Sequence, residues 1–235
     1  KNINDVGSIK RARRKMMPDN TRRAELVSKI ITKRSRILEI GSGHGFFLDI
    51  MKKNGYDITG FEISKEKRKY SKKVTKVPVL DININEKIPT VKPFDIVVLF
   101  HTLEHIIDPV ILLKNIKKLL KPKGKVLVEV PNCDDFHLGL NKFYKEFYWE
   151  RAHIHYFNSK SLKTVINLGG FKGIKITGVQ RYSIGNFFHW RLKNKPQMEN
   201  PTYSLSGKLN WLDDSYKKYL ERNLICDTLI SIANI

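Results

Sequence analysis

The chain has 235 residues, of which 41% are hydrophobic and 10% aromatic, which is enough apolar material for one domain with a single core. No apolar run approaches the roughly 20 residues of a membrane-spanning helix, and residues 1–36 are too polar for a signal peptide. The formal net charge of +21 indicates an anionic ligand, and two widely separated cysteines indicate a reducing, cytoplasmic location.

The positive charge is densest at the N-terminus, where residues 1–36 carry twelve Lys or Arg and only three acidic residues. Apolar side chains recur at helical spacing over residues 20–34, so residues 1–35 are predicted to be a basic, helical segment. No arginine-glycine or aromatic-basic motif accompanies this charge, which argues against nucleic acid as the partner. The alternative is that the lysines simply cover solvated helix faces.

Strands and helices alternate regularly between residues 36 and 131. Each predicted strand is a short apolar run, and amphipathic runs between strands favour helices. The predicted strands are residues 36–40, 56–63, 77–82, 94–100 and 125–131, and the predicted helices are residues 46–55, 64–73 and 108–120. This alternation predicts a doubly wound α/β sheet with right-handed crossovers.

The pattern changes after Pro131. Residues 159–168 favour a helix, and residues 173–182 and 224–233 favour two further strands, which makes seven in all. Residues 132–158 and 184–222 are aromatic stretches without a clean period, although a helix is expected near residues 206–222. We expect one domain over residues 1–235, with these two stretches inserted as a cap on the acceptor side.

The stretch ILEIGSGHG, residues 37–45, is the most informative motif. A strand ends in Glu39-Ile40 and runs directly into Gly41, Gly43 and Gly45, which permit a sharp turn and close backbone approach of a ligand. The last interval is one residue shorter than in the dinucleotide-binding G-x-G-x-x-G loop. With an acid two residues before the first glycine, the loop suits a ligand that carries an ammonium group and no phosphate.

Two further acids follow the next strands. Glu62 ends the second strand, where a carboxylate can accept hydrogen bonds from both ribose hydroxyls. Asp81 ends the third strand, where it can accept a hydrogen bond from an adenine amine. Each acid alone could be a solvated strand end, but three acids in register on successive strands form a more specific pattern.

Together these segments resemble the class I S-adenosylmethionine-dependent methyltransferases, over about residues 35–182 and again over 224–233. The resemblance implies a Rossmann-like seven-stranded sheet with its last strand antiparallel, and S-adenosylmethionine as the cofactor. The element LEHxxDP resembles the subgroup that methylates small molecules, including quinone precursors, sugars and glycan intermediates. The motifs that carry it are ILEIGSGHG, GFEIS, VLDI, FDIVVLFHTLEHIIDP, LKPKGKVLVEVPN, HIHYFNSKSLKTVINLGGF and CDTLISIA.

The resemblance also implies which residues bind the cofactor. Glu62 with Ile63 would bind the ribose, and Asp81 with the backbone of Ile82 would bind the adenine. Many relatives carry Asp at the first acidic position, where this chain has Glu. The residues expected near the methionine part are Glu39, Gly41, Gly43, Gly45, Phe100 and His101.

An alcohol acceptor needs a general base, and histidine suits this role near neutral pH. His105 is the first candidate because it lies just past the fourth strand, at the carboxyl edge where α/β sheets bind ligands. His101 and Glu104 are expected to position it. The residues expected to contact the acceptor are His153, His155 and Tyr156. In the alternative view these side chains only stabilise the loop and the cap.

Residues 101–105, HTLEH, also have the H-x-x-E-H spacing of an inverted zinc-peptidase motif. That motif needs both histidines on one helix. Here a strand is predicted to end near Phe100 and a new helix to start at Pro109, so a full helical turn between them is doubtful. The sequence therefore predicts no catalytic zinc and assigns no metal ligands, while a divalent ion in another role is left open.

These features favour an S-adenosylmethionine-dependent methyltransferase that methylates oxygen on a small, anionic acceptor. We expect a sugar or a nucleotide-linked or phosphorylated glycan intermediate, as in polysaccharide biosynthesis. The alternatives are an RNA methyltransferase, which the charge alone supports, and a non-catalytic protein that only binds S-adenosylmethionine. The sequence does not indicate the oligomeric state.

Overall fold

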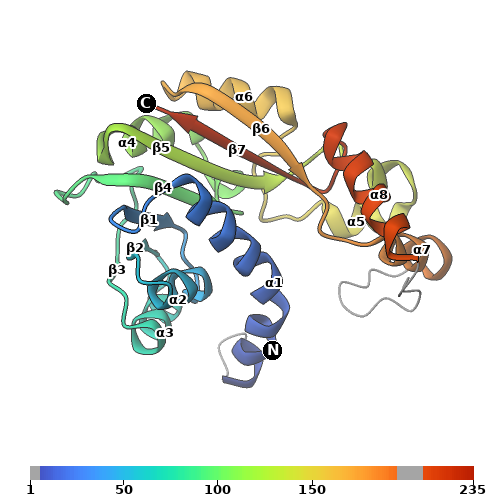
Figure 1. The fold of residues 1–235 in the computed structure, drawn as a ribbon, viewed down its shortest axis with the longest axis horizontal. Coiled ribbons are helices and arrows are strands. Elements are labelled where there is room, and N and C mark those ends of the chain that lie inside the picture. The colour runs from blue at the N-terminus through green and yellow to red at the C-terminus, as the bar shows by residue number, and fades with distance from the viewer. Residues whose placement is uncertain (1–5, 195–208) are drawn as a thin grey trace.

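The computed structural model describes residues 6–194 and 209–235, and within them one seven-stranded sheet has the order β3-β2-β1-β4-β5-β7-β6. β7 runs antiparallel to its neighbours β5 and β6, while β1 to β5 pair in parallel. The doubly wound sheet with an antiparallel last strand is thereby confirmed (Figure 1). The strands are β1 (Arg36–Ile40), β2 (Asp57–Phe61), β3 (Val79–Leu80), β4 (Phe94–Phe100), β5 (Leu120–Pro131), β6 (Lys172–Val179) and β7 (Thr228–Asn234).

Helices cover both faces of this sheet (Figure 1). On one face α1 and α2 bury apolar side chains against β1, β2 and β4, and on the other α4 and α6 do the same. Side chains on both sides of the strands are therefore buried, as the nearly continuous apolar run of β4 predicts. The flanking helices are α1 (Val6–Ile30), α2 (Phe46–Lys53), α3 (Lys65–Thr75), α4 (Pro109–Leu119) and α6 (Ser159–Leu168).

The remaining helices gather at one end of the sheet and form the cap (Figure 1). Its small core is aromatic, with Tyr144, Tyr148, Tyr182 and Trp190 buried against one another. The cap elements are η2 (Phe136–Gly139), α5 (Lys142–Tyr148), α7 (Ile184–Lys193) and α8 (Asn210–Arg222).

Several boundaries differ from the sequence-based expectation. α1 begins at Val6, inside the predicted helical segment but before residue 20, where the apolar periodicity starts. β3 is only two residues long, and α7 occupies a stretch predicted to be irregular. α7 has a capping box at Ser183 and Asn186. This is a local signal for the start of a helix, and apolar periodicity does not reveal it. The part of the 184–222 insertion at residues 195–208 lies outside the described residues.

The first half of α1 is stabilised by its contact with α2. This half carries few apolar side chains but lies along α2, where Arg13 forms an ion pair with Asp49. Burial alone would raise the pKa of Asp49, but Lys53 and Arg13 outweigh burial and lower that pKa. Because the partner lies 36 residues away in the chain, apolar periodicity could not indicate this half of the helix.

The second half of α1 is fixed to the sheet by Glu129 of β5, which is fully buried. Arg22 donates two hydrogen bonds to this carboxylate, at 2.9 and 3.0 Å, and Arg23 donates two more, at 2.5 and 2.9 Å. Burial would raise the pKa of Glu129, but Arg23, His101 and Arg22 outweigh it and hold the pKa well below its usual range. The carboxylate is therefore ionised and bridges helix and sheet.

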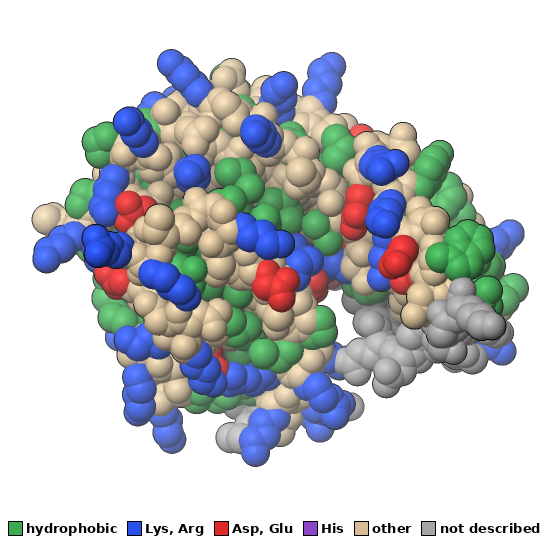
Figure 2. Space-filling view, viewed as in Figure 1, with side chains coloured by type: hydrophobic (Ala, Val, Ile, Leu, Met, Phe, Trp, Pro, Cys, Tyr) green, Lys and Arg blue, Asp and Glu red, His purple; other side chains and the backbone are tan. Residues whose placement is uncertain are grey.

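The surface shows how the net charge is distributed. Lys and Arg side chains are spread over the visible face rather than gathered in one patch (Figure 2). Among the described residues, no helix is both long enough and apolar enough to cross a bilayer.

Replacing Glu129 tests how α1 is attached. The Glu129→Gln variant should lose about 3 kcal/mol of unfolding free energy, because it leaves the buried Arg23 and the partly buried Arg22 without the charge of Glu129. Denaturant unfolding followed by circular dichroism measures this loss. The matched change Glu146→Gln, in an exposed pair with Lys142, should shift the value by less than about 0.5 kcal/mol. Equal stability of both variants would contradict the bridging role.

Candidate active site

The glycine loop joins β1 to α2 and has the backbone geometry that the motif predicts. Gly41 has φ +73°, and a Cβ added there would lie 2.5 Å from Oγ1 of Thr102, so only glycine fits. Gly43 has φ +54°, but its missing Cβ would meet nothing within 4 Å. The loop is therefore packed against the β4 end at Gly41 and open at Gly43, where a ligand can approach the backbone.

Glu62, directly after β2, holds this loop in place. Its Oε2 accepts a hydrogen bond from the Gly43 backbone at 2.7 Å, and its Oε1 accepts one from Ser64 at 2.8 Å. Each carboxylate oxygen has a second lone pair, so the fixed Glu62 can still accept from two further donors such as ribose hydroxyls.

A narrow cavity of about 90 Å³ begins at Glu62 and has mainly apolar walls, which suit the faces of a flat base. Ile63 and Ile82, two of the residues expected to bind the cofactor, line it, but Asp81 is absent from its lining. The Asp81 carboxylate is exposed and lies 2.6 Å from Arg68, with which it forms an ion pair. Its contact with adenine stays a prediction.

A second cavity, of about 310 Å³, shares Gly41 with the first, so the two adjoin. Glu39 and Phe100 line it from the sheet, and Met16, Asn20 and Arg23 line it from α1, a contribution that the sequence did not indicate.

Glu39 is the unusual group in this second cavity. It is 5% exposed, and its Oε2 makes no hydrogen bond within the described part of the chain. Burial raises the pKa of Glu39 well above its usual range, although Arg23 opposes the shift. An isolated buried carboxylate is costly, and an arriving ammonium group would supply the missing counter-charge.

His101 follows β4 directly, in a left-handed conformation with φ +47° that is uncommon outside glycine. Its Nδ1 lies 3.3 Å from Glu104, and its Nε2 lies 3.4 Å from Glu129. Burial would lower the pKa of His101, but these two carboxylates outweigh it and raise that pKa. The imidazole is thus held between two acids at the carboxyl edge of the sheet.

A third cavity, of about 240 Å³, lies between His101 and the cap. Its walls are mainly aromatic, from Tyr144, Phe147 and Tyr148 of α5 together with Tyr182. The sequence showed these rings only as an aperiodic aromatic stretch, so their convergence was not predicted. A cavity of this size and lining accommodates one ring-shaped small molecule.

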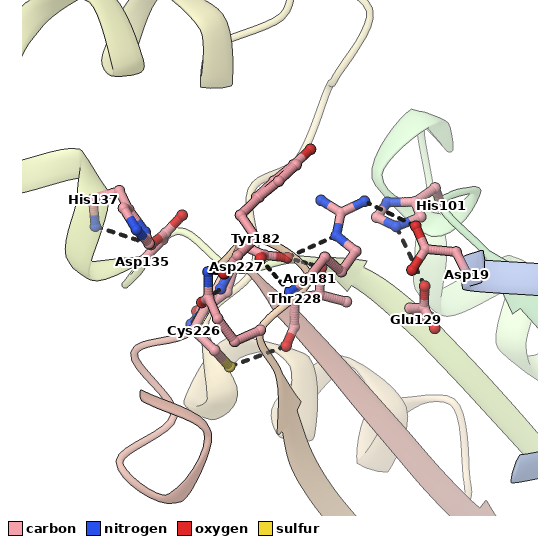
Figure 3. Close-up of polar contacts among 12 residues, drawn as sticks. Asp19, His101, Glu129, Asp135, His137, Arg181, Tyr182, Cys226, Asp227 and Thr228 are labelled. Atoms are coloured by element: carbon pink, nitrogen blue, oxygen red, sulfur yellow. Dashed lines mark hydrogen bonds and ion pairs between the residues drawn. The ribbon is translucent and has the colours of Figure 1, made fainter. Parts of the chain in front are cut away.

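Arg181 is the main cation in this third cavity. Its Nε donates a hydrogen bond to Asp227 at 2.7 Å, and its Nη1 lies 3.9 Å from Asp19 (Figure 3). Burial would lower the pKa of Arg181, but Asp227 leads the groups that raise it well above normal. The guanidinium points toward His101 (Figure 3), and no sequence motif indicated it.

The other residues predicted for the acceptor site differ in their position relative to this third cavity. His153 lines it, whereas His105 is exposed and donates through Nδ1 to the Ala152 carbonyl at 2.8 Å. His155 donates to the Ile107 carbonyl at 3.2 Å, and Tyr156 donates to that of Glu150 at 2.9 Å. His155 and Tyr156 therefore form hydrogen bonds to backbone carbonyls and are absent from the lining of the cavity.

A family model described as "Methyltransferase domain" matches residues 9–176, which is more than half of the chain. The chain belongs to the class I S-adenosylmethionine-dependent methyltransferases. This agrees with the sheet order, the glycine loop and the acids near the carboxyl ends of β1 and β2.

Named relatives are distant. A ubiquinone biosynthesis O-methyltransferase of Coxiella burnetii is 24% identical over 180 residues, which cover 68% of this chain and 73% of the relative. Others of that name are matched over about half of their length, for example 45% in Haemophilus ducreyi.

Solved structures share the methyltransferase fold. An S-adenosylmethionine-dependent methyltransferase of Archaeoglobus fulgidus has a TM-score of 0.62 at 19% identity, covering 92% of this chain and 94% of that one. Phosphoethanolamine N-methyltransferase 2 of Haemonchus contortus, in complex with S-adenosylmethionine, has a TM-score of 0.56 at 21% identity and is matched over 87% and 49%.

The cavities of this methyltransferase fit its cofactor. The unpaired carboxylate of Glu39 suits the ammonium of the methionine part, and the fixed carboxylate of Glu62 suits the ribose. When bound, the sulfonium supplies an activated methyl group, so the protein has to position an acceptor and manage one proton.

Substituting Glu39 should separate cofactor binding from folding. The Glu39→Gln variant should bind S-adenosylmethionine about 10- to 100-fold more weakly, since a charge-assisted hydrogen bond contributes about 1.5–3 kcal/mol. Its melting temperature without cofactor should be unchanged or higher, because an unpaired buried acid is removed. Isothermal titration calorimetry and thermal unfolding measure the two effects. Asp214→Asn, an exposed acid on α8, serves as the control. Wild-type affinity of Glu39→Gln would contradict the assignment.

Proposed function

We propose that this methyltransferase transfers a methyl group to a hydroxyl oxygen of a small, ring-shaped acceptor. The observation that carries the proposal is the aromatic-walled cavity of about 240 Å³ beside His101. His101 follows Phe100, which lines the larger cofactor cavity, so acceptor and methyl donor would meet at the end of β4.

In this proposal the cofactor occupies the two adjoining cavities around Gly41. Its ammonium group is paired with Glu39, its ribose hydroxyls with Glu62, and its adenine lies between Ile63 and Ile82. Support comes from the unpaired oxygen of Glu39 and from the mainly apolar walls of the cavity that begins at Glu62. Asp81 would meet the adenine amine only if its ion pair with Arg68 opened or was shared.

The acceptor would stack on the aromatic side chains of α5 and be oriented by Arg181. Two acceptor classes fit such walls. The first is the anionic sugar or glycan intermediate expected from the sequence, whose negative group Arg181 would bind. The second is a phenolic ring, which the names of the O-methyltransferase relatives favour. Asp227 and Glu150 also line the cavity and partly offset the charge of Arg181.

His101 is the proposed proton acceptor. It lines the acceptor cavity, and its buried Nε2 makes no hydrogen bond within the described residues, although a carboxylate oxygen of Glu129 lies 3.4 Å away. His105, the first choice from the sequence, lies four residues further along the chain, where its ring contacts that of His153 at a centroid distance of 4.8 Å. We therefore assign the role of proton acceptor to His101 and not to His105.

The two alternatives predict different measurements. An RNA methyltransferase would incorporate methyl groups into RNA and lose RNA affinity steeply with rising salt. A non-catalytic protein would bind S-adenosylmethionine without turnover on any acceptor. The small size of the acceptor cavity and the scattered surface cations favour neither of them (Figure 2).

An acceptor panel tests the proposed reaction. Purified protein with radiolabelled S-adenosylmethionine should methylate members of one class among nucleotide-linked sugars, phosphorylated sugars and hydroxylated aromatic acids, and should not label total RNA. Tyr148→Ala should raise the KM for that acceptor at least about tenfold, because lost stacking and burial cost upwards of about 1.5 kcal/mol. Labelled RNA with no labelled small molecule would overturn the proposal.

The His101→Asn variant tests the proton acceptor. Asparagine tolerates the left-handed backbone found at this position, so the variant should fold like the wild type. Loss of general-base catalysis should lower kcat about 10²- to 10⁴-fold while the Kd for S-adenosylmethionine changes little. Turnover by stopped assay and calorimetric Kd give the comparison. A kcat equal to that of the wild type would assign the proton elsewhere.

A further inference from the structure

One cluster of side chains at the rim of the acceptor cavity has no part in the proposed transfer. Glu104, His105 and His153 each offer one ligand atom, and these three atoms lie within 4.8 Å of one another. We propose that these three residues bind a divalent first-row transition-metal ion such as Co²⁺, Mn²⁺ or Zn²⁺.

Glu104 supplies the strongest argument for a ligand. Its side chain is 1% exposed, and its Oε1 lies 3.3 Å from His101. Its Oε2 is buried and has no hydrogen-bond partner within the described residues. A buried carboxylate oxygen left without a partner is costly, and a bound cation would compensate for it.

The two histidines are arranged as metal ligands. The Nδ1 of His105 donates to the Ala152 carbonyl at 2.8 Å, which fixes the tautomer and leaves the lone pair of Nε2 available. The Nδ1 of His153 is buried and, in the part of the chain that the structure describes, has no partner. Two imidazoles and one carboxylate thus converge with unused lone pairs.

The backbone holds this arrangement without an ion. The carbonyl of Glu104, in the short helix η1 (Leu103–His105), accepts hydrogen bonds from Ile154 at 2.8 Å and His155 at 3.0 Å. These bonds tie η1 to the segment that carries His153. Small side-chain rotations then suffice to bring the ligand atoms to the roughly 2.0–2.2 Å bond lengths of a transition metal.

The donor set selects the kind of metal. Imidazole nitrogens suit Zn²⁺, Co²⁺ and related ions, whereas Mg²⁺ and Ca²⁺ prefer oxygen ligands. Two histidines and one carboxylate leave coordination positions open. Because His153 also lines the acceptor cavity, an acceptor oxygen could fill one of them. This last step rests on the proposed function, whereas metal binding itself does not.

Metal binding is tested on tag-free protein dialysed against EDTA. Titration with Co²⁺, followed by its visible absorption, should give one ion per chain, which Zn²⁺ displaces and Mg²⁺ at the same concentration does not. Each single replacement of a proposed ligand should weaken Co²⁺ binding by about tenfold or more, because even the loss of a residue that only hydrogen-bonds to a ligand has an effect of that size. The variants are Glu104→Gln, His105→Gln and His153→Gln.

His155→Gln is the matched control, since this histidine lies in the same segment but donates to the Ile107 carbonyl, and it should bind Co²⁺ like the wild type. Circular dichroism confirms that exposed His105→Gln is folded. Equal Co²⁺ affinity of wild type and His105→Gln, or no saturable binding of Co²⁺, Zn²⁺ or Mn²⁺, would overturn the proposal.

S-adenosylmethionine affinity is measured separately on the metal-free protein. Cofactor binding without any metal binding would remove the metal site and leave the methyltransferase proposal intact. Metal binding without methylation of any acceptor would support the metal site and overturn the proposed methyl transfer.

Discussion

The buried carboxylate of Glu129 is the group on which the arrangement of the site depends. It lies at the end of β5, where it accepts hydrogen bonds from Arg22 and Arg23 of α1 and lies 3.4 Å from the imidazole of His101. One ionised group therefore connects the N-terminal helix, the central sheet and the residue beside the acceptor cavity. Since α1 also lines the larger of the two cavities proposed for the cofactor, the placement of both proposed substrates depends on the same charge.

The interior of the site has a different electrostatic character from the surface. The chain carries a net charge of +21, yet the groups that line or adjoin its cavities include the acids Glu39, Glu62, Glu104 and Glu129. A cofactor with an ammonium and a sulfonium group suits such an interior. Net charge alone pointed to an anionic acceptor, but Arg181 is the main cation of the acceptor cavity and is already paired with Asp227. Surface charge and site charge are thus separate properties here.

Features that depend on neighbouring residues were predictable from the sequence. The glycine loop, the strand-end acid Glu62 and the helix expected over residues 108–120 rest on local signals. The structure has all three where expected, with Asp108 accepting a hydrogen bond from Ile111 at the start of α4. Features that depend on distant partners were not predictable. The first half of α1 is fixed by Asp49, and Arg181 reaches its position through Asp227, 46 residues further along. The rings of the acceptor cavity likewise converge only because α5 and the segment after β6 pack together.

The cap is made of two chain segments that leave the sheet and return to it, one between β5 and β6 and the other between β6 and β7 (Figure 1). In the part of the chain that the structure describes, neither segment contributes a strand, so their length and side chains can change while the strand register stays the same. In the proposed function, acceptor preference is thereby physically separable from cofactor binding. An engineered chain could exchange α5 and α7 for those of another scaffold and keep the methyl donor, provided that the contact of the 152–155 segment with η1 is preserved.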